Sequence, residues 1–183
     1  GTPTAKWRSI MGHNGRVTTP FTVTYVCTGN ICRSPVGAVA LRDQLVPAGL
    51  AGRVAVTSAG TGDWHVGERA DPRALAVLSA HGHNGDRHRA RQFCPTDFSD
   101  ADLVLALDRG HLRTLRALAR SDADRAKVRL LRSFDPEAAE RGELDVIDPY
   151  FGGNAEFETT YAVVAAANLG LIAHLSEILD PRR

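Results

Sequence analysis

Apolar and polar positions along the chain predict strands and helices in alternation. Short runs of β-branched residues and leucine without a polar face are typical of strands buried on both sides, and they occur at 21–27, 53–58, 103–107 and 128–131. Longer segments with apolar residues on one helical face occur at 35–46, 72–81, 109–120 and 156–179. This succession predicts an α/β, doubly wound fold, with a parallel sheet and helices on both faces.

Residues that begin helices support these boundaries. Asp71 followed by Pro72 is typical of a cap and first helical turn, and Asn154 precedes an acidic start of the last helix. The polar stretches 83–99 and 132–155 contain no comparable periodicity. We therefore expect them to be loops within one domain.

Length and composition agree with a single domain over residues 21–183. The chain has 183 residues, of which 43 % are hydrophobic, and this is enough for a sizeable core. Residues 1–20 contain no apolar run of signal-peptide length, so we expect a disordered extension; with the only methionine at Met11, part of it is compatible with a cloning remnant. The longest apolar stretch, 161–175, is shorter than a membrane span of about 20 residues.

The strongest chemical signal follows directly on the first predicted strand. A cysteine, five intervening residues, an arginine and a serine at a strand-to-helix junction describe a loop that can wrap a tetrahedral oxyanion. The segment reads Cys27-Thr28-Gly29-Asn30-Ile31-Cys32-Arg33-Ser34-Pro35.

Elementary physics explains why this loop would bind an anion. Pro35 suits the first position of a helix, so the loop ends where unpaired N–H groups and the positive end of the helix dipole attract negative charge. Gly29 and Asn30 accept positive φ, which lets the loop amides point inward. Arg33 presents a planar fork suited to two phosphate oxygens. Together these residues form a receptor for a dianion.

The same loop carries a nucleophile. Cys27 lies beside a cation and a helix N-terminus, which favour the thiolate form, and a thiolate in line with bound phosphorus can form a phosphocysteine intermediate. Ser34 can donate a hydrogen bond to the sulfur as it leaves in a second step. The leaving oxygen also needs a proton, and Asp148 beside Pro149 and Tyr150 is the best candidate for the acid, although sequence alone does not select it among the other acidic residues.

These motifs resemble the low molecular weight protein tyrosine phosphatases, in their bacterial, actinobacterial type. The resemblance covers roughly residues 21–180 and includes the loop and Asp148-Pro149-Tyr150. Four further segments match: Ser58-Ala59-Gly60-Thr61, Asp63-Trp64-His65-Val66-Gly67, His88-Arg89-Ala90-Arg91-Gln92 and Leu105-Ala106-Leu107-Asp108. It implies a three-layer fold around a four-stranded parallel sheet of order 2-1-3-4.

The resemblance also implies residue roles. Cys27 would be the nucleophile, Arg33 would bind the phosphoryl group and Asp148 would donate the proton. Ser58 and His88 would hold one loop residue, Asn30, in a strained conformation. The other residues around the phosphate would be Thr28, Gly29, Asn30, Ile31, Cys32 and Ser34.

Aromatic residues would complete the site. By resemblance Trp64, Tyr150 and Phe151 form the walls of the cleft; many family members carry a second tyrosine at the position of Phe151. Aromatic walls around an anion site favour an aryl phosphate. The expected function is therefore a protein-tyrosine-phosphatase that acts on phosphotyrosine proteins and small aryl phosphates through a phosphocysteine, without metal or cofactor, and is inhibited by phosphate-like oxyanions.

Charge and cysteine content set the expected partners and compartment. The net charge of +1 gives no long-range attraction to nucleic acid or to a membrane, and we expect neither as a partner. Three cysteines, Cys27, Cys32 and Cys94, are too few and of odd number for a disulfide scaffold. A catalytic thiol requires a reducing setting, so we expect a cytoplasmic location, with export by a signal-less route left open.

Other interpretations fit these residues less well. Cys27 and Cys32 do not supply the four ligands of a zinc site, and the histidines at 81, 83 and 88 are interrupted by glycines, so no metal site is expected. The arginines at 109, 113, 116 and 120 are interpreted as a solvated helix face. Two alternative functions stay open: an arsenate reductase on the same scaffold, for which only Cys94 remains outside the loop, and a phosphate-binding module without catalysis.

Overall fold

The structure, a computed structural model, describes residues 10–11 and 17–180. Within the predicted N-terminal extension, strands β1 (Ile10–Met11) and β2 (Val17–Thr18) pair in antiparallel fashion. The remainder of the extension up to residue 18 lies outside the described residues, and so does the end of the chain after residue 180.

A four-stranded parallel sheet forms the centre of the domain. Its order is β4-β3-β5-β6, so that the first of these strands along the chain lies between the second and the third. This is the predicted order 2-1-3-4. The strands are β3 (Phe21–Cys27), β4 (Val54–Gly60), β5 (Leu103–Ala106) and β6 (Val128–Leu130).

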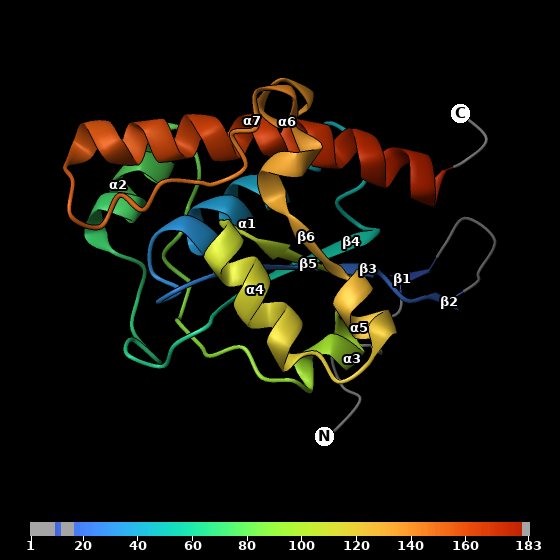
Figure 1. Cartoon of the computed structure of the whole chain (residues 1–183). Helices are drawn as coiled ribbons and strands as arrows, with labels where there is room; N and C mark the ends of the chain where they lie inside the picture. Colours follow the sequence, from blue (N-terminus) through green and yellow to red (C-terminus); the bar gives the residue numbers. More distant parts are fainter. Residues whose placement is uncertain (1–9, 12–16, 181–183) are drawn as a thin grey trace.

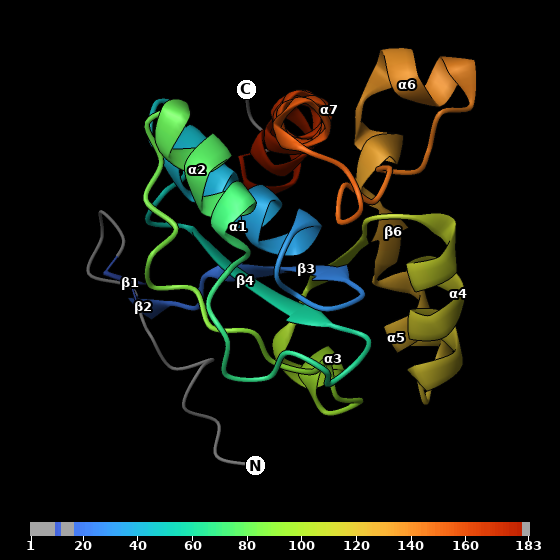
Figure 2. The same cartoon turned by 90° about the vertical axis from the view of Figure 1, so that its left-hand side faces the viewer.

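Helices cover both faces of the sheet, as predicted (Figures 1 and 2). One face carries α1 (Arg33–Gln44), α2 (Pro72–Ala80) and α7 (Asn154–Leu179). The other carries α3 (Asp97–Asp100), α4 (Arg109–Leu118) and α5 (Asp122–Ala126). Figure 2 shows α1 and α2 above β3 and β4, with α3 below them.

The prediction of continuous loops over 83–99 and 132–155 is wrong in part. The first stretch includes part of α3, and the second contains most of the 3₁₀ helix η2 (Leu131–Phe134) and α6 (Pro136–Arg141). Local caps stabilise α6: the Asp135 carboxylate accepts from the amides of two residues, and Gly142 ends the helix with a positive φ of 71°. Helices this short bury too few side chains to show a clear apolar period.

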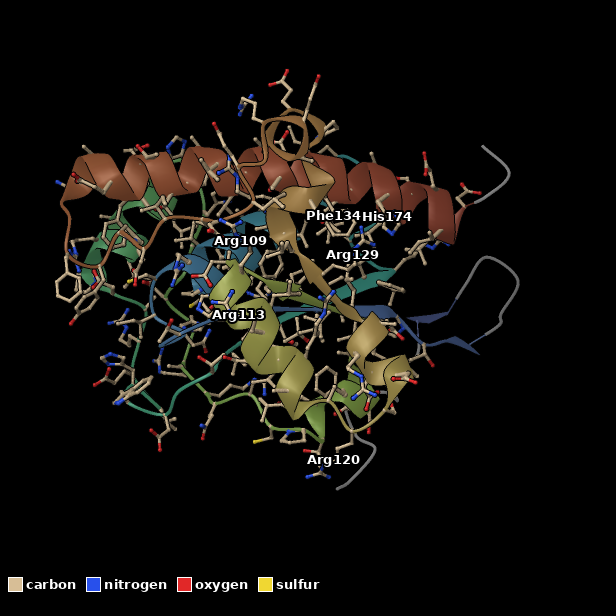
Figure 3. All side chains as sticks on the ribbon, in the orientation of Figure 1. Arg109, Arg113, Arg120, Arg129, Phe134 and His174 are labelled. Carbon is tan, nitrogen blue, oxygen red and sulfur yellow. The ribbon has the colours of Figure 1, made fainter. Side chains whose placement is uncertain are left out.

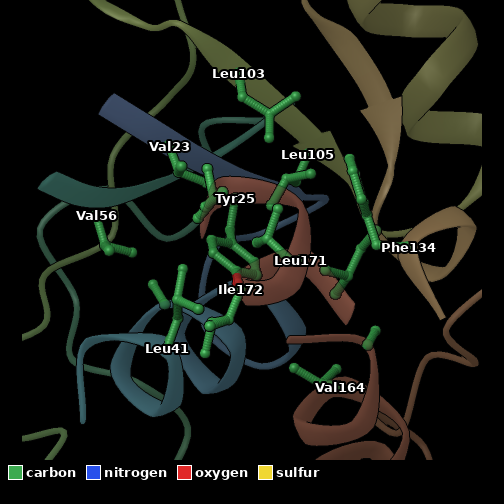
Figure 4. Close-up of a cluster of buried hydrophobic side chains, with 14 of the residues drawn as sticks. Val23, Tyr25, Leu41, Val56, Leu103, Leu105, Phe134, Val164, Leu171 and Ile172 are labelled. Carbon is green, nitrogen blue, oxygen red and sulfur yellow. The ribbon is translucent and has the colours of Figure 1, made fainter. Parts of the chain in front are cut away.

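The larger apolar core lies between the sheet and the pair α1 and α7 (Figure 4). Tyr25 of β3 is fully buried in it, and its hydroxyl donates to Asn168 Oδ1 of α7 at 2.5 Å. The Asn168 amide nitrogen donates in turn to Gln44 Oε1 at 2.9 Å and to the Gly37 carbonyl at 3.3 Å. This buried polar network joins β3, α1 and α7 with its hydroxyl and amide groups bonded, as a buried site requires.

The C-terminal helix α7 is a packed element of this domain. By length and apolar composition it would also suit a bilayer, but its residues Val164, Leu171 and Leu175 are buried against the sheet. Gly170 permits a close approach to η2, because a Cβ there would lie 1.8 Å from the Phe134 carbonyl oxygen. A glycine costs helix stability, yet here it is required by packing.

Candidate active site

The segment Cys27 to Ser34, called here the phosphate loop, joins the end of β3 to the start of α1. It therefore lies at the carboxyl edge of the sheet, where ligands bind in doubly wound folds. Within the described residues, Asn30 is the one non-glycine residue with a positive φ, at 58°. A Cβ on Gly60 of the neighbouring strand would lie 2.6 Å from the Thr28 carbonyl oxygen, so the loop passes directly over that glycine.

Four groups hold Asn30 in its left-handed conformation. Its amide nitrogen donates to Ser34 Oγ at 2.8 Å and to Ser58 Oγ at 3.0 Å, and its Oδ1 accepts from the Arg91 amide at 3.0 Å. His88 Nε2 lies 2.6 Å from the Asn30 carbonyl oxygen. The structure thus brings Ser58 and His88 to Asn30 and adds Arg91, which contributes only its backbone and leaves no side-chain signal in the sequence.

The Cys27 thiol is buried at the base of the loop. Its Sγ lies 2.9 Å from Ser34 Oγ, and the Ser34 amide donates to the sulfur at 3.4 Å. Both contacts come from the first turn of α1, where amides are not used by the helix itself. Hydrogen bonds and a helix N-terminus both favour negative charge on this sulfur.

The guanidinium of Arg33 is fixed by groups from outside the loop. Its Nη1 donates to Asp108 Oδ2 and to the Val146 carbonyl, both at 2.8 Å, and its Nη2 lies 3.6 Å from Asp148 Oδ2. With Nη1 occupied in this way, the remaining N–H groups are available to a bound anion. The matching segment that ends at Asp108 was noted in the sequence, but no role was assigned to it; its position directly after a predicted strand is the signal that could have found it.

Asp108 also links Arg33 to His111 and so to the phosphate loop. The Asp108 carboxylate caps α4 by accepting from the His111 amide at 2.9 Å, and His111 Nε2 lies 2.8 Å from Thr28 Oγ1. Burial acts to raise the pKa of Asp108, but the hydrogen bonds from the His111 amide and the Arg33 guanidinium outweigh it and lower the pKa. Sequence analysis did not single out His111, because a lone histidine on a helix carries no pattern.

His111 is held neutral at physiological pH. Burial and the charge of Arg33 lower its pKa from 6.5 to about 4, in spite of the Asp108 carboxylate, whose Oδ1 lies 3.2 Å from Nδ1 at an angle that makes no hydrogen bond. Between these two values the unfolded chain binds a proton at this histidine and the folded protein does not. Its contribution to stability is therefore complete above pH 6.5 and is lost as the pH falls toward 4.

We expect His111→Gln to flatten the pH dependence of stability. The free energy of unfolding can be measured by urea titration at several values between pH 7 and pH 4. It should fall less steeply with decreasing pH than in the unsubstituted protein, because up to one proton fewer is taken up on unfolding. His174→Gln, a histidine on α7 away from the phosphate loop, is the matched control. An unchanged slope in His111→Gln would contradict the assignment of a depressed pKa.

An open hollow of about 160 Å³ lies over the phosphate loop. Trp64 and Tyr150, 70 % and 41 % exposed, form part of its lining, and so does His65, for which no role was predicted. Phe151, also predicted as a wall of the cleft, does not line this hollow and is 95 % exposed. Adjacent residues of a turn point in different directions, and the Phe151 ring instead meets the Tyr150 ring edge to face at 5.0 Å.

Two residues at the start of α2 connect the Tyr150 turn to the phosphate loop. The Asp71 amide donates to the Ile31 carbonyl at 2.9 Å, and the Asp71 carboxylate binds the Arg73 guanidinium. Arg73 Nη1 donates to the carbonyls of Tyr150 and Gly152 at 2.9 and 2.8 Å. Sequence analysis recognised Asp71 only as a helix cap, since its contact with the loop exists only in three dimensions.

The other two cysteines are poorly suited to a thiol relay. Burial, together with the charges of Asp71, Cys27 and Asp148, raises the pKa of Cys32 to about 12, so that this thiol stays protonated. Cys94 is exposed and is absent from the lining of the hollow. An arsenate reductase requires resolving thiols that attack readily, so this arrangement does not favour that alternative. Among the described residues, no three histidine, cysteine or acidic side chains gather as a metal site.

Comparison with known proteins agrees with this geometry. Residues 22–179 match the family described as low molecular weight phosphotyrosine protein phosphatase. The chain belongs to this family. The low molecular weight protein-tyrosine-phosphatase of Streptomyces coelicolor is 54 % identical over 162 residues, which are 88 % of this chain and 98 % of that protein. The chain is thus a protein-tyrosine-phosphatase, a hydrolase, with an actinobacterial relative.

Solved structures of the family share the fold. The protein tyrosine phosphatase of Entamoeba histolytica matches with a TM-score of 0.81 and 27 % identity, over 87 % of this chain and 99 % of that one. Wzb of Vibrio vulnificus, solved with benzylphosphonate, matches with a TM-score of 0.71 and 28 % identity, over 84 % of this chain and 98 % of that one. The shared fold therefore covers nearly the whole length of both solved structures and most of this chain.

Proposed function

We propose that this phosphatase hydrolyses phosphotyrosine in proteins through a phosphocysteine formed on Cys27. The observation that carries the proposal is that Cys27, Arg33 and Asp148 line one hollow, with the thiol at its base and the carboxyl at its side. The Asp148 side chain is about half exposed, at 49 %, and so reaches solvent and a leaving group alike. A nucleophile, a cation and an acid converging on one site are the parts that phosphoryl transfer requires.

The first step transfers the phosphoryl group to sulfur. The Cys27 thiolate attacks phosphorus, the bond from phosphorus to the phenolic oxygen breaks, and Asp148 gives its proton to that oxygen. Arg33 and the loop amides stabilise the charge on the three equatorial oxygens. Asp108 holds the guanidinium in position through Nη1, which leaves its other N–H groups for the phosphoryl oxygens.

The second step releases inorganic phosphate. Water attacks phosphorus, the Asp148 carboxylate accepts its proton, and the phosphorus–sulfur bond breaks. Ser34 Oγ, 2.9 Å from Sγ, donates a hydrogen bond to the departing thiolate. Tyrosine leaves in the first step and phosphate in the second. The second step also returns the Asp148 carboxyl and the Cys27 sulfur to their original states.

The walls of the hollow support an aromatic phosphate as substrate. Trp64 and Tyr150 present exposed ring surface above an anion site, which suits a phenyl ring on a short linkage to phosphate. Benzylphosphonate, the ligand of the Vibrio vulnificus relative, has this same combination of ring and anion. We infer that phosphate-like oxyanions compete with substrate at the loop, and that the enzyme works in a reducing compartment such as the cytoplasm, where a catalytic thiol is kept reduced.

Replacement of Asp148 by asparagine tests the acid assignment. We expect kcat on phenyl phosphate to fall by about 10² to 10⁴, because an amide cannot protonate the phenoxide, with KM little changed. The loss should be smaller for an aryl phosphate whose leaving group is already a weak base.

Asp63→Asn serves as the matched control, since Asp63 is an exposed carboxylate that precedes Trp64 and does not line the hollow. It should leave turnover unchanged. Full turnover in Asp148→Asn would show that another group is the acid.

A further inference from the structure

A second hollow lies beside β4, the edge strand of the central sheet. Its volume is about 440 Å³, against 160 Å³ for the hollow over the phosphate loop. Volumes of about 300–1,000 Å³ are typical of sites for small molecules. The hollow, called here the arginine hollow, is lined by Arg42, Thr57, Ser58, Arg87, His88, Arg89 and Arg91.

Positive charge dominates this lining. Four of its seven residues are arginines, contributed by α1 and by the segment 87–91, and none is a carboxylate. Arg91 is neutralised by Asp97 at 3.1 Å, whereas Arg42 and Arg89 donate only to backbone carbonyls. Arg87 has no ion pair with any carboxylate that the structure describes. Three guanidinium charges therefore face one space without an anion among the residues that line it.

Three lining residues are also those that hold the catalytic loop. Ser58, His88 and Arg91 supply every contact to Asn30 that comes from outside the phosphate loop. Among the described residues, Arg89 donates to the carbonyls of Asp86 and His88, and neither Arg87 nor Arg89 has a side-chain hydrogen bond to the phosphate loop. The arginine hollow is thus linked to the phosphate loop through residues that line the hollow and bond to Asn30.

We propose that the arginine hollow binds a small anion with several phosphate groups, and that its occupancy restrains the loop through Asn30. Guanidinium groups bind phosphate oxygens in pairs, and the hydroxyls of Thr57 and Ser58 add neutral donors at the same surface. The hollow is much larger than the one that receives a single phosphoryl group. Three cations without an ion-paired carboxylate also repel one another, so an anion with several charges gains more here than orthophosphate does.

Binding has a consequence for the loop. An anion bridging Arg87 and Arg89 restrains the segment 87–91, which carries both the His88 ring and the Arg91 amide bonded to Asn30. Opening of that segment becomes rarer when a ligand binds only the closed form. The Arg91 amide should therefore exchange its hydrogen more slowly when the hollow is occupied.

Tripolyphosphate serves as the probe for the arginine hollow. Benzylphosphonate at a saturating concentration occupies the phosphate loop, so that tripolyphosphate cannot bind there. Calorimetric titration of the saturated enzyme should show one molecule of tripolyphosphate bound. In Arg87→Ala/Arg89→Ala the dissociation constant should rise at least tenfold, since charge-assisted bonds are lost. Arg87→Ala alone should raise the dissociation constant as well. Among the described residues the Arg87 side chain makes no hydrogen bond or ion pair, so this variant separates lost binding from a folding defect. Hydrolysis of aryl phosphate without tripolyphosphate should be unaltered in both variants.

Arg113→Ala/Arg120→Ala is the matched control, because it removes the same charge from an exposed face on and just beyond α4 (Figure 3). Its dissociation constant should stay within twofold of the unsubstituted value. No binding to the saturated enzyme, or equal weakening in both double variants, would overturn the proposed site; unchanged exchange of the Arg91 amide would overturn its link to the loop. These outcomes are independent of catalysis, so a failure of the phosphocysteine mechanism would be seen separately.

Discussion

Replacement of Cys27 by serine should reduce hydrolysis of phenyl phosphate by a factor of about 10⁴ or more. A serine hydroxyl is a much weaker nucleophile than a cysteine sulfur, and the variant cannot form the phosphorus–sulfur bond. Because serine is slightly smaller and still polar, it can keep a contact with Ser34 Oγ, which lies 2.9 Å from the sulfur. The expected result is therefore an enzyme without turnover that still binds anions.

Two measurements are needed to interpret this variant. Single-turnover kinetics followed by mass spectrometry should detect a phosphoryl adduct on the unsubstituted enzyme and none on Cys27→Ser, while calorimetry should show benzylphosphonate binding to both. Cys94→Ser, which changes an exposed cysteine outside the hollow, should retain full activity. If Cys27→Ser kept more than a tenth of the original rate, the phosphocysteine route would have to be abandoned.

The second large effect is expected for Arg33→Lys, with a loss of about 10³ in kcat/KM. Lysine keeps the charge but replaces a planar fork with a point charge, so it cannot bind Asp108 and two phosphate oxygens at once. Arg33 is buried, with only 3 % of its surface exposed, and its Nη1 is fully engaged by Asp108 and the Val146 carbonyl. Simultaneous binding of Asp108 and of the phosphate therefore depends on the planar shape of the guanidinium.

Both kcat and the affinity for benzylphosphonate should fall in Arg33→Lys, because the fork contacts phosphate in the ground state and in the transition state. Arg129→Lys changes an exposed arginine whose guanidinium stacks on Phe134, far from the phosphate loop in the chain, and should leave both quantities unchanged (Figure 3). Thermal unfolding should be compared for both variants. A folded Arg33→Lys enzyme with near-normal kcat/KM would remove Arg33 from the mechanism.

Much of the site could be predicted because its parts are adjacent in the chain. The segment Cys27 to Ser34 contains the thiol, the cation and the hydroxyl within eight residues, and its local physics is set by a strand, a glycine-containing turn and a helix start. Asp148 was predicted as the acid from its place beside Pro149 and Tyr150, with support from the family resemblance, because no property of an isolated aspartate selects it. Its Oδ2 lies 3.6 Å from Arg33 Nη2 although 115 positions separate the two residues.

Residues that act from elsewhere in the fold were found less well. Asp108, His111 and Arg73 each contact the phosphate loop or the turn that carries Tyr150. Of these, only Asp108 carried a usable signal, its position directly after a predicted strand. Phe151 shows the opposite case, in which an aromatic residue beside a wall residue was assigned to the same site. Its direction depends on the turn geometry, which is not encoded by residue type alone.

The sequence by itself determined the alternation of strands and helices, the anion-binding loop at the end of β3 and the chemistry that Cys27 and Arg33 can perform. These properties depend on neighbouring residues, because apolar periodicity, helix caps and loop conformation are local. Only the tertiary structure decided which distant groups meet: Asp108 on the Arg33 guanidinium, His111 on Thr28, and three arginines with unneutralised charge beside the residues that hold Asn30. Such contacts arise when parallel strands place their carboxyl ends side by side, and a one-dimensional pattern does not record that proximity.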